Sequence, residues 1–263
     1  ALGGLAVSSG SGSTLAEKTG LDVVDGSDDA SADAKITGRT WLEYTISKTG
    51  GTDILDLSAT NANLTYTFSL NENDESVVTV TDGVRTLMAT DINEIKGGQG
   101  TNTYVLVSGA SYGGTLTGHI SGTDILELSG YATAVSVDLS AGSVATVSPV
   151  STILSGLSGI DQVIGSASGD TLTGDANNNT FLFSDNWGID TVTPGAGSDT
   201  LDFSAVTTDL TFTFATDGSL TVTDGTNSVT VSDSTTLEAV IGGSGSNSYV
   251  FEDGADFAAG TIN

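Results

Sequence analysis

The chain has 263 residues, of which 33 are acidic and only six are Lys or Arg, so its formal net charge is −27 at pH 7. This charge argues against nucleic acid as a partner, because binding to phosphates requires Lys and Arg, and it disfavours attachment to anionic membranes. The absence of cysteine excludes disulfides and thiolate metal sites. No apolar run approaches the about 20 residues of a membrane-spanning helix.

Residues 1–39 differ in composition from the rest of the chain. Residues 8–14 are Ser and Gly only, apart from one Thr, and five Asp residues fall between Asp22 and Asp33. We interpret residues 1–39 as an acidic, Ser/Gly-rich leader or cap, and we favour a solvated loop over a cation site for its acidic part. Residues 1–7 lack the length and the basic flank of a signal peptide.

A ten-residue phrase then occurs three times, at spacings of 71 and 75 residues. The copies are Gly51-Thr-Asp-Ile-Leu-Asp-Leu-Ser-Ala-Thr60, Gly122-Thr-Asp-Ile-Leu-Glu-Leu-Ser-Gly-Tyr131 and Gly197-Ser-Asp-Thr-Leu-Asp-Phe-Ser-Ala-Val206. A nearly constant spacing indicates a tandem repeat. We therefore divide the chain into the leader and three repeat units, at residues 40–121, 122–196 and 197–263.

Polar and apolar residues alternate within each unit, which is the pattern of strands with one buried face. Asp-Gly pairs separate such runs in the first and third units, at residues 82–83, 217–218 and 224–225, and predict hairpins. A second shared phrase closes these units at residues 92–106 and 237–251. The sequence predicts an all-β fold, an elongated tandem-repeat β-solenoid or β-roll with hairpin extensions and about three units.

The second unit contains two adjacent nonamers, Gly165-Ser-Ala-Ser-Gly-Asp-Thr-Leu-Thr173 and Gly174-Asp-Ala-Asn-Asn-Asn-Thr-Phe-Leu182, and two more follow at 185–193 and 194–202. They resemble the calcium-binding nonamers of RTX (repeats-in-toxin) proteins. In that family six residues form a turn, three form a strand, and Ca²⁺ lies between stacked turns. The resemblance implies that the eighth-position residues Leu172, Phe181, Val192 and Leu201 fill the core. The metal ligands that it implies are Asp170, Asp175, Asn179, Asp190 and Asp199.

Alternate turns stack in that family, so Asp170 is expected beside Asp190 and Asn179 beside Asp199. Two extra residues, Phe183 and Ser184, interrupt the series, and several of the family's glycines are replaced. Calcium-bound turns and degenerate, metal-free turns therefore both stay open. We expect Asp53 and Asp124, which lack an Asp nine residues earlier, to cap turns.

Catalysis has few candidate residues. His119 is the only histidine, and no Lys or Arg follows Lys96, so nucleophile–His pairs and His-based zinc sites have little support. Aromatic residues could stack on sugars, but Tyr104 and Tyr249 fall on the apolar positions of the repeat and are expected in the core. We do not expect an enzyme.

The phrases resemble most closely those of very long repetitive surface proteins of Gram-negative-type bacteria. This resemblance implies a non-catalytic, extracellular or cell-surface structural segment, a stalk or adhesin, with neighbouring repeats end to end. The alternative is a self-assembling subunit of a filament, sheath or surface layer, with identical subunits end to end. A module that binds cell-surface glycan is the third reading.

Overall fold

The computed structural model describes residues 6–7, 21–25, 34–38, 44–47, 53–257 and 260–263. Most of the leader predicted at residues 1–39, and Trp41, lie outside these ranges. The regular secondary structure of the described residues is β-strand, apart from one short 3-10 helix at Ser234–Thr236, and these residues form no α-helix. The part of the chain that the structure describes contains no helix long and apolar enough to cross a membrane. The all-β prediction is confirmed.

The chain divides into two compact units, Ala1–Leu126 with Ile153–Ile160, and Glu127–Thr152 with Asp161–Asn263. We call them the first and the second compact unit. They are defined by packing, whereas the three repeat units at residues 40–121, 122–196 and 197–263 are defined by recurring phrases. The boundaries of the repeat units stay a prediction.

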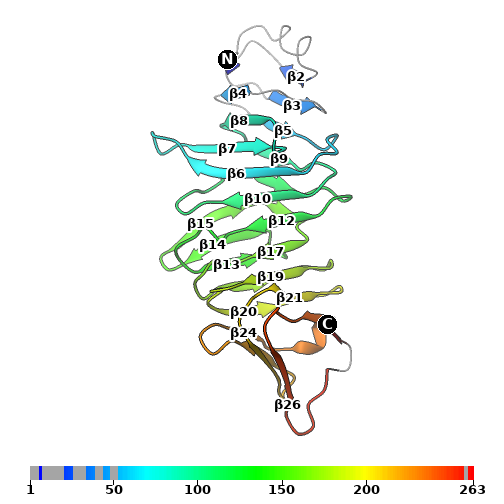
Figure 1. Ribbon diagram of the computed structural model, residues 1–263. Coiled ribbons are helices and arrows are strands. Elements are labelled where there is room, and N and C mark those ends of the chain that lie inside the picture. Colours follow the sequence, from blue (N-terminus) through cyan, green and yellow to red (C-terminus); the bar gives the residue numbers. More distant parts are fainter. Residues whose placement is uncertain (1–5, 8–20, 26–33, 39–43, 48–52, 258–259) are drawn as a thin grey trace. The chain divides into compact units, whose positions relative to one another are not determined.

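The first compact unit contains two groups of paired strands (Figure 1). One has the order β1 (Ala6–Val7), β4 (Tyr44–Ser47), β8 (Thr86–Thr90), β7 (Ser76–Thr81), β6 (Leu64–Leu70), β10 (Asn102–Leu106) and β12 (Asp124–Glu127). The other has the order β16 (Leu157–Ser158), β11 (Thr115–Thr117), β9 (Glu94–Lys96), β5 (Ile54–Asp56), β3 (Ala34–Gly38) and β2 (Leu21–Asp25). Most described pairs are parallel, but β6, β7 and β8 are antiparallel neighbours, and β2 pairs with β3 in the antiparallel sense.

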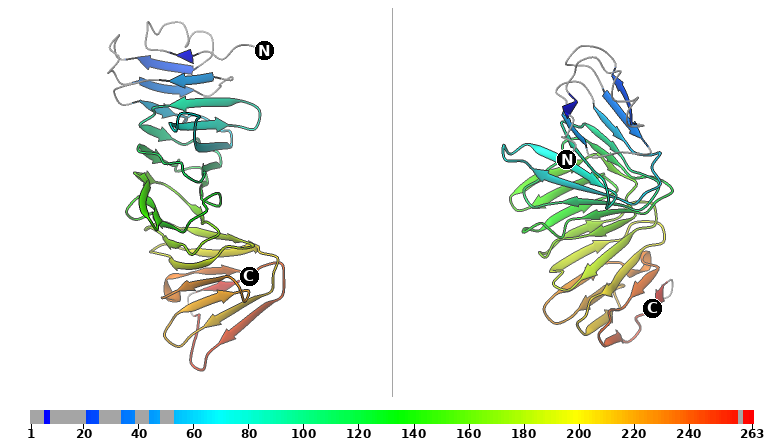
Figure 2. Two further views of the ribbon diagram at one scale, coloured as in Figure 1. Left: turned by 90° about the vertical axis from the view of Figure 1, so that its left-hand side faces the viewer. Right: turned by 45° about the horizontal axis from the view of Figure 1, so that its top comes forward.

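The second compact unit also combines parallel and antiparallel pairs (Figure 2). A fully parallel series has the order β17 (Gln162–Ile164), β19 (Thr180–Ser184), β21 (Thr200–Ala205), β25 (Ala239–Ile241) and β27 (Thr261–Ile262). A mixed sheet has the order β15 (Val150–Ser155), β14 (Ser143–Val147), β13 (Val135–Asp138), β18 (Thr171–Thr173), β20 (Ile189–Thr193), β24 (Ser228–Val231), β23 (Leu220–Thr223), β22 (Leu210–Phe214) and β26 (Asn247–Phe251).

The Asp-Gly hairpins form where the sequence predicts them. Gly83, Gly218 and Gly225 have φ values of 86°, 85° and 90°, the left-handed region that glycine enters without steric cost. They join β7 to β8, β22 to β23 and β23 to β24, all antiparallel pairs. The hairpins insert antiparallel strands among parallel ones, so the sheets are mixed.

The core follows the alternation of the sequence. Leu172, Phe181, Val192 and Leu201 are all buried, as their eighth-position placement predicts. A stacked pair of rings, Phe183 and Phe203, lies in the core of the second compact unit, with ring centroids 4.7 Å apart. Burial of these side chains is the main favourable contribution to the folding of each unit.

The two closing phrases occupy the same place in their respective units. β10 pairs with β6 in parallel so that Tyr104 faces Tyr66, and β26 pairs with β22 so that Tyr249 faces Phe212. Both pairs of rings are in contact: Tyr66 and Tyr104 are tilted, with centroids 4.8 Å apart, and Phe212 and Tyr249 are stacked, with centroids 4.7 Å apart. The sequence repeat is therefore also a repeat of strand register.

Candidate functional site

The structure brings together the residue pairs that the nonamers predict. The main-chain N–H of Asp170 donates to Oδ1 of Asp190 at 2.8 Å, and that of Asn179 donates to Oδ1 of Asp199 at 2.7 Å. All four side chains are buried. The interruption at Ser184 is absorbed by an irregularity in the pairing of β19 with β21, so the register of the turns survives it.

The same contact recurs elsewhere, and we call the side chains that accept it the acceptor ladder. Val135 donates its N–H to Asp170 at 2.8 Å, and Asp199 donates its N–H to Glu238 at 2.6 Å. In the first compact unit Asp53 donates to Asn93 at 2.8 Å. The acceptor ladder therefore comprises Asn93, Asp170, Asp190, Asp199 and Glu238. Its members satisfy main-chain N–H groups that would otherwise be buried without a partner.

A second set of hydrogen bonds closes the Gly-rich turns. Oδ1 of Asn102 accepts the N–H of Gly98 at 3.1 Å, and Oδ1 of Asn247 accepts the N–H of Gly243 at 3.1 Å. Asn179 does the same for Asp175 at 2.8 Å. Asn is therefore suited to the sixth position for a reason unrelated to metal, because its amide can both accept from and donate to the turn backbone.

Close contact between turns explains one glycine of the nonamers. A Cβ atom at Gly174 would lie 1.8 Å from the carbonyl oxygen of Pro194. The two turns are also joined directly, since the N–H of Ala196 donates to the carbonyl of Asp175 at 3.0 Å. The nonamer turns at 174–178 and 194–198 thus stack backbone on backbone.

The donor set offers a weak fit to calcium, which takes six to eight oxygen ligands. The oxygens of Asp170 accept from Val135 and from both the N–H and the hydroxyl of Ser166. Those of Asp175 accept from the main chain and the side chain of Asn177. Within the described residues no group of three or more His, Cys, Asp or Glu side chains is placed to hold a metal. Calcium binding by the five predicted ligands stays a prediction.

Asp199 differs from the other predicted ligands. Its Oδ1 accepts from Asn179, but its Oδ2 is buried without a hydrogen-bond partner among the described atoms. Burial raises the pKa of Asp199 to about 6, and the nearby carboxylates of Glu238 and Asp175 add to the effect. Of the five predicted residues, Asp199 is the one with a buried carboxylate oxygen that is open to a proton or a cation.

Burial also raises the pKa of Asp190, to about 8, against the opposing effect of the hydrogen bond from Asp170. It raises the pKa of Asp170, which the hydrogen bonds from Val135 and Ser166 oppose. No Lys or Arg follows Lys96 in the chain, so no basic side chain of the second compact unit neutralises these groups. A proton on Asp190 at neutral pH removes the charge while Oδ1 still accepts a hydrogen bond.

The expectation that Asp124 caps a turn is confirmed. Its Oδ2 accepts the N–H of His119 at 2.8 Å, and its Oδ1 accepts from Nδ2 of Asn102 at 2.8 Å and from the hydroxyl of Tyr104 at 3.1 Å. His119 itself accepts the N–H of Ser121 through Nδ1, as expected for a turn residue. The sequence did not mark Asn102 and Tyr104 as partners of this carboxylate.

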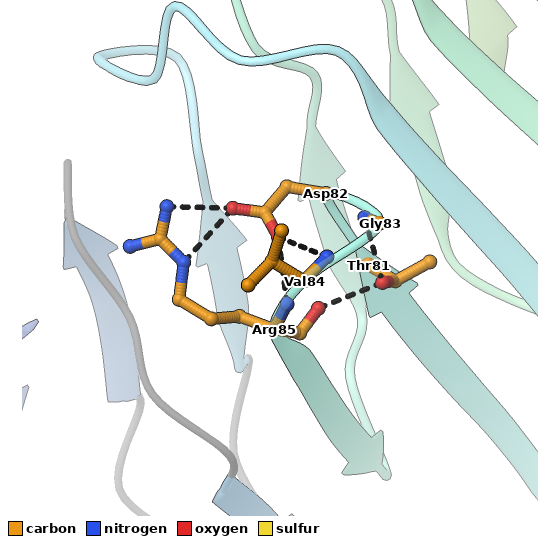
Figure 3. Close-up of polar contacts among 5 residues, drawn as sticks. All are labelled: Thr81, Asp82, Gly83, Val84 and Arg85. Atoms are coloured by element: carbon orange, nitrogen blue, oxygen red, sulfur yellow. Dashed lines mark hydrogen bonds and ion pairs between the residues drawn. The ribbon is translucent and has the colours of Figure 1, made fainter.

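The half-buried carboxylates of two hairpins, Asp82 and Asp224, bind their own turns. Asp82 accepts the N–H groups of Val84 and Arg85 at 3.0 and 2.7 Å and forms an ion pair with the Arg85 guanidinium at 2.6 Å (Figure 3). In the second compact unit Asp224 accepts the N–H groups of Thr226 and Asn227 at 2.8 and 2.7 Å. The same turn forms with Asn in place of Arg, so the carboxylate–backbone bonds are its common feature.

The aromatic residues leave few platforms for a sugar. Tyr104 is buried as expected, and Trp187 is also buried, with its ring against Phe183 and Phe203. Tyr249 is only half-buried, so its placement in the core holds in part. Phe251 is 46% exposed. Comparison of the chain with protein-family models and with curated proteins gives no match.

Proposed function

We propose that this chain is a non-catalytic structural repeat segment of an extracellular or cell-surface bacterial protein, a stalk or adhesin. The observation that supports it best is the use of the buried polar residues. The side chains of the acceptor ladder accept main-chain N–H groups, so they stabilise the fold. The location rests on the resemblance of the repeated phrases to bacterial surface proteins.

The finer architecture that we propose is a β-solenoid within each compact unit, extended by hairpins. Its support is the series of parallel pairs in the second compact unit, where β17, β19, β21 and β25 follow each other in the sheet order. The equal register of the β10–β6 and β26–β22 pairs adds to it. In solenoid proteins each repeat is stabilised by contacts with its neighbouring repeats, which suits a long scaffold.

Surface exposure tests the proposed location. Antibodies raised against the chain should label intact cells of the source organism, and permeabilisation should add little signal. Labelling that appears only after permeabilisation would contradict an extracellular role. Hydrolysis or epimerisation of an acidic polysaccharide by the purified chain would contradict the non-catalytic part of the proposal.

Calcium stabilisation is the metal part of the proposal, and the open Oδ2 of Asp199 supports it. Thermal unfolding in calcium and in a chelator, together with elemental analysis, tests it. If Asp199 binds the ion, chelator should lower the melting temperature of the parent chain and leave that of Asp199→Asn unchanged. A melting temperature that chelator does not change, together with no bound metal, would contradict calcium stabilisation.

The alternative, a self-assembling subunit, has one specific observation in its favour. β26 lies at the end of the sheet order in the second compact unit and carries the exposed Phe251. Sedimentation velocity over a range of concentrations separates the two readings, because a polymerising subunit grows with concentration whereas a stalk segment stays monomeric.

A further inference from the structure

The edge strand β26 has a counterpart inside the chain that is covered. β10 and β26 carry the same sequence pattern, Asn-Thr-Tyr-Val-Leu and Asn-Ser-Tyr-Val-Phe, and the same register to β6 and β22. β10 lies between β6 and β12 (Figure 1). In contrast, β26 has β22 as its one neighbour in the described sheet. The first compact unit therefore shows what the edge of β26 is shaped to receive.

The turn before each strand is built in the same way. Nδ2 of Asn102 donates to the carbonyl of Gly98 at 2.7 Å, and Nδ2 of Asn247 donates to that of Gly243 at 2.8 Å. Asn102 makes two contacts more: its N–H donates to the carbonyl of Thr123 at 2.9 Å, and its Nδ2 donates to Asp124 at 2.8 Å. Both additional contacts come from the segment that enters β12.

The side chains of β10 are more deeply buried than those of β26. Asn102, Tyr104 and Leu106 are all 0% exposed, whereas Asn247 and Tyr249 are half-buried and Phe251 is 46% exposed. An apolar edge strand with main-chain groups open to solvent is a template for pairing with another strand. The difference in burial marks the surface that β12 covers in one case and that is open in the other.

We propose that the outer edge of β26 docks one further strand of the repeat phrase, Gly-Thr-Asp followed by alternating apolar residues. The Asp of that strand accepts from Nδ2 of Asn247 and from the hydroxyl of Tyr249, as Asp124 accepts from Asn102 and Tyr104. The N–H of Asn247 donates to the carbonyl of the residue before that Asp. This inference rests on the proposed function and specifies the chemistry of its end-to-end partner.

The neighbouring strands support the spacing that this docking needs. β27 pairs with β25 as β11 pairs with β9, and the N–H of Gly242 donates to Asn263 as that of Gly97 donates to Thr117. Asp124 follows Thr115 by nine residues. A copy of residues 118–131 attached after Asn263 places its Asp nine residues after Thr261, at the same spacing.

The experiment uses the full chain carrying this 14-residue copy as a C-terminal extension, compared with the unextended chain. Amide hydrogen exchange at Asn247 is expected to slow at least about tenfold in the extended chain, because the N–H gains a carbonyl partner. Replacing the Asp of the copy by Ala (D124A in the copy only) should reverse most of this protection. The host variant Tyr249→Phe, which keeps the stacked ring, should weaken docking about tenfold by removing a hydrogen bond to a carboxylate.

Two results would overturn the proposal. One is an extension whose amides exchange like those of a free peptide while exchange at Asn247 is unchanged. The other is protection of Asn247 in the unextended chain that increases with protein concentration, because a second copy then occupies the edge. If exchange at Asn247 is unchanged by the extension but antibodies label intact cells, the docking alone is contradicted. If antibodies label only permeabilised cells, the proposed location is contradicted.

Discussion

Asp170 and Asp190 are joined by a bond from the main-chain N–H of the first to Oδ1 of the second, at 2.8 Å. Both residues are buried, and no cationic side chain is available in the sequence after Lys96. A buried carboxylate without a cation either takes up a proton or raises the energy of the folded state. We therefore expect the stability of the second compact unit to depend on pH through the buried carboxylates of the acceptor ladder.

Stability of the second compact unit should fall as pH rises from about 4 to about 8. The pKa of Asp190 is raised to about 8 and that of Asp199 to about 6, whereas an unfolded Asp titrates near about 3.9. The folded state thus holds more protons than the unfolded state in this window, and the stabilisation present below about pH 4 is lost through the folded pKa. Urea unfolding at pH 5 and pH 8 measures it.

Asp190→Asn tests the assignment, since Asn keeps an acceptor oxygen and cannot ionise. We expect it to be about 1–3 kcal/mol more stable than the parent chain at pH 8.5 and to show a flatter pH dependence between 6 and 8. Asp185→Asn is the matched control, because it removes the same charge from an exposed turn whose pKa is lowered by hydrogen bonds from Thr207. If both variants show the same pH dependence of stability, Asp190 is not its cause.

Asn102→Ala should destabilise the chain by about 2–4 kcal/mol, because it removes the buried acceptor of the Gly98 N–H and one of the donors to Asp124. Asn247→Ala is its internal control. Asn247 closes an equivalent turn but is half-buried and lacks the contact to a neighbouring carboxylate, so we expect a loss of about 1 kcal/mol. Chemical unfolding of both variants measures the difference, and equal losses would mean that the contact with Asp124 contributes nothing.

Gly174→Ala should destabilise the stacked turns by about 1–3 kcal/mol, because the added Cβ would overlap the Pro194 carbonyl at 1.8 Å. Gly113→Ala is the control, since nothing lies within 4 Å of a Cβ there. It should leave the melting temperature within about 2 °C of the parent value, as for an uncrowded surface change. A tolerated Gly174→Ala would show that the two turns separate readily.

Arg85→Asn should change stability by less than about 1 kcal/mol, because an ion pair whose Arg side chain is 35% exposed contributes little and Asn occupies the same place in the turn at residues 224–227. Asp82→Ala should cost more, about 1–2 kcal/mol, since it removes the acceptor of two main-chain N–H groups. Thermal unfolding of the two variants ranks them. A larger loss of stability from Arg85→Asn than from Asp82→Ala would show that the ion pair contributes more to the turn than the carboxylate–backbone hydrogen bonds.

Much of the local structure could be predicted from the sequence. The Asp-Gly pairs gave hairpins at Gly83, Gly218 and Gly225 because each turn needs a positive φ. The pairings of Asp170 with Asp190 and of Asn179 with Asp199 were implied by the resemblance of the nonamers to RTX repeats. The two compact units could not be predicted, because a repeated phrase reports local register and carries no information on which repeats pack most closely.

The sequence by itself determined the strands and their buried faces, because alternation acts through the geometry of the strand. The stacking of the nonamer turns was implied only by their resemblance to RTX repeats. The tertiary structure decided which groups the recurring Asp and Asn side chains bind. Asp170, Asp190 and Asp199 accept main-chain N–H groups from neighbouring turns. Every residue except proline carries such a donor, so no side-chain pattern marks it, and only the folded register shows which donor meets which carboxylate.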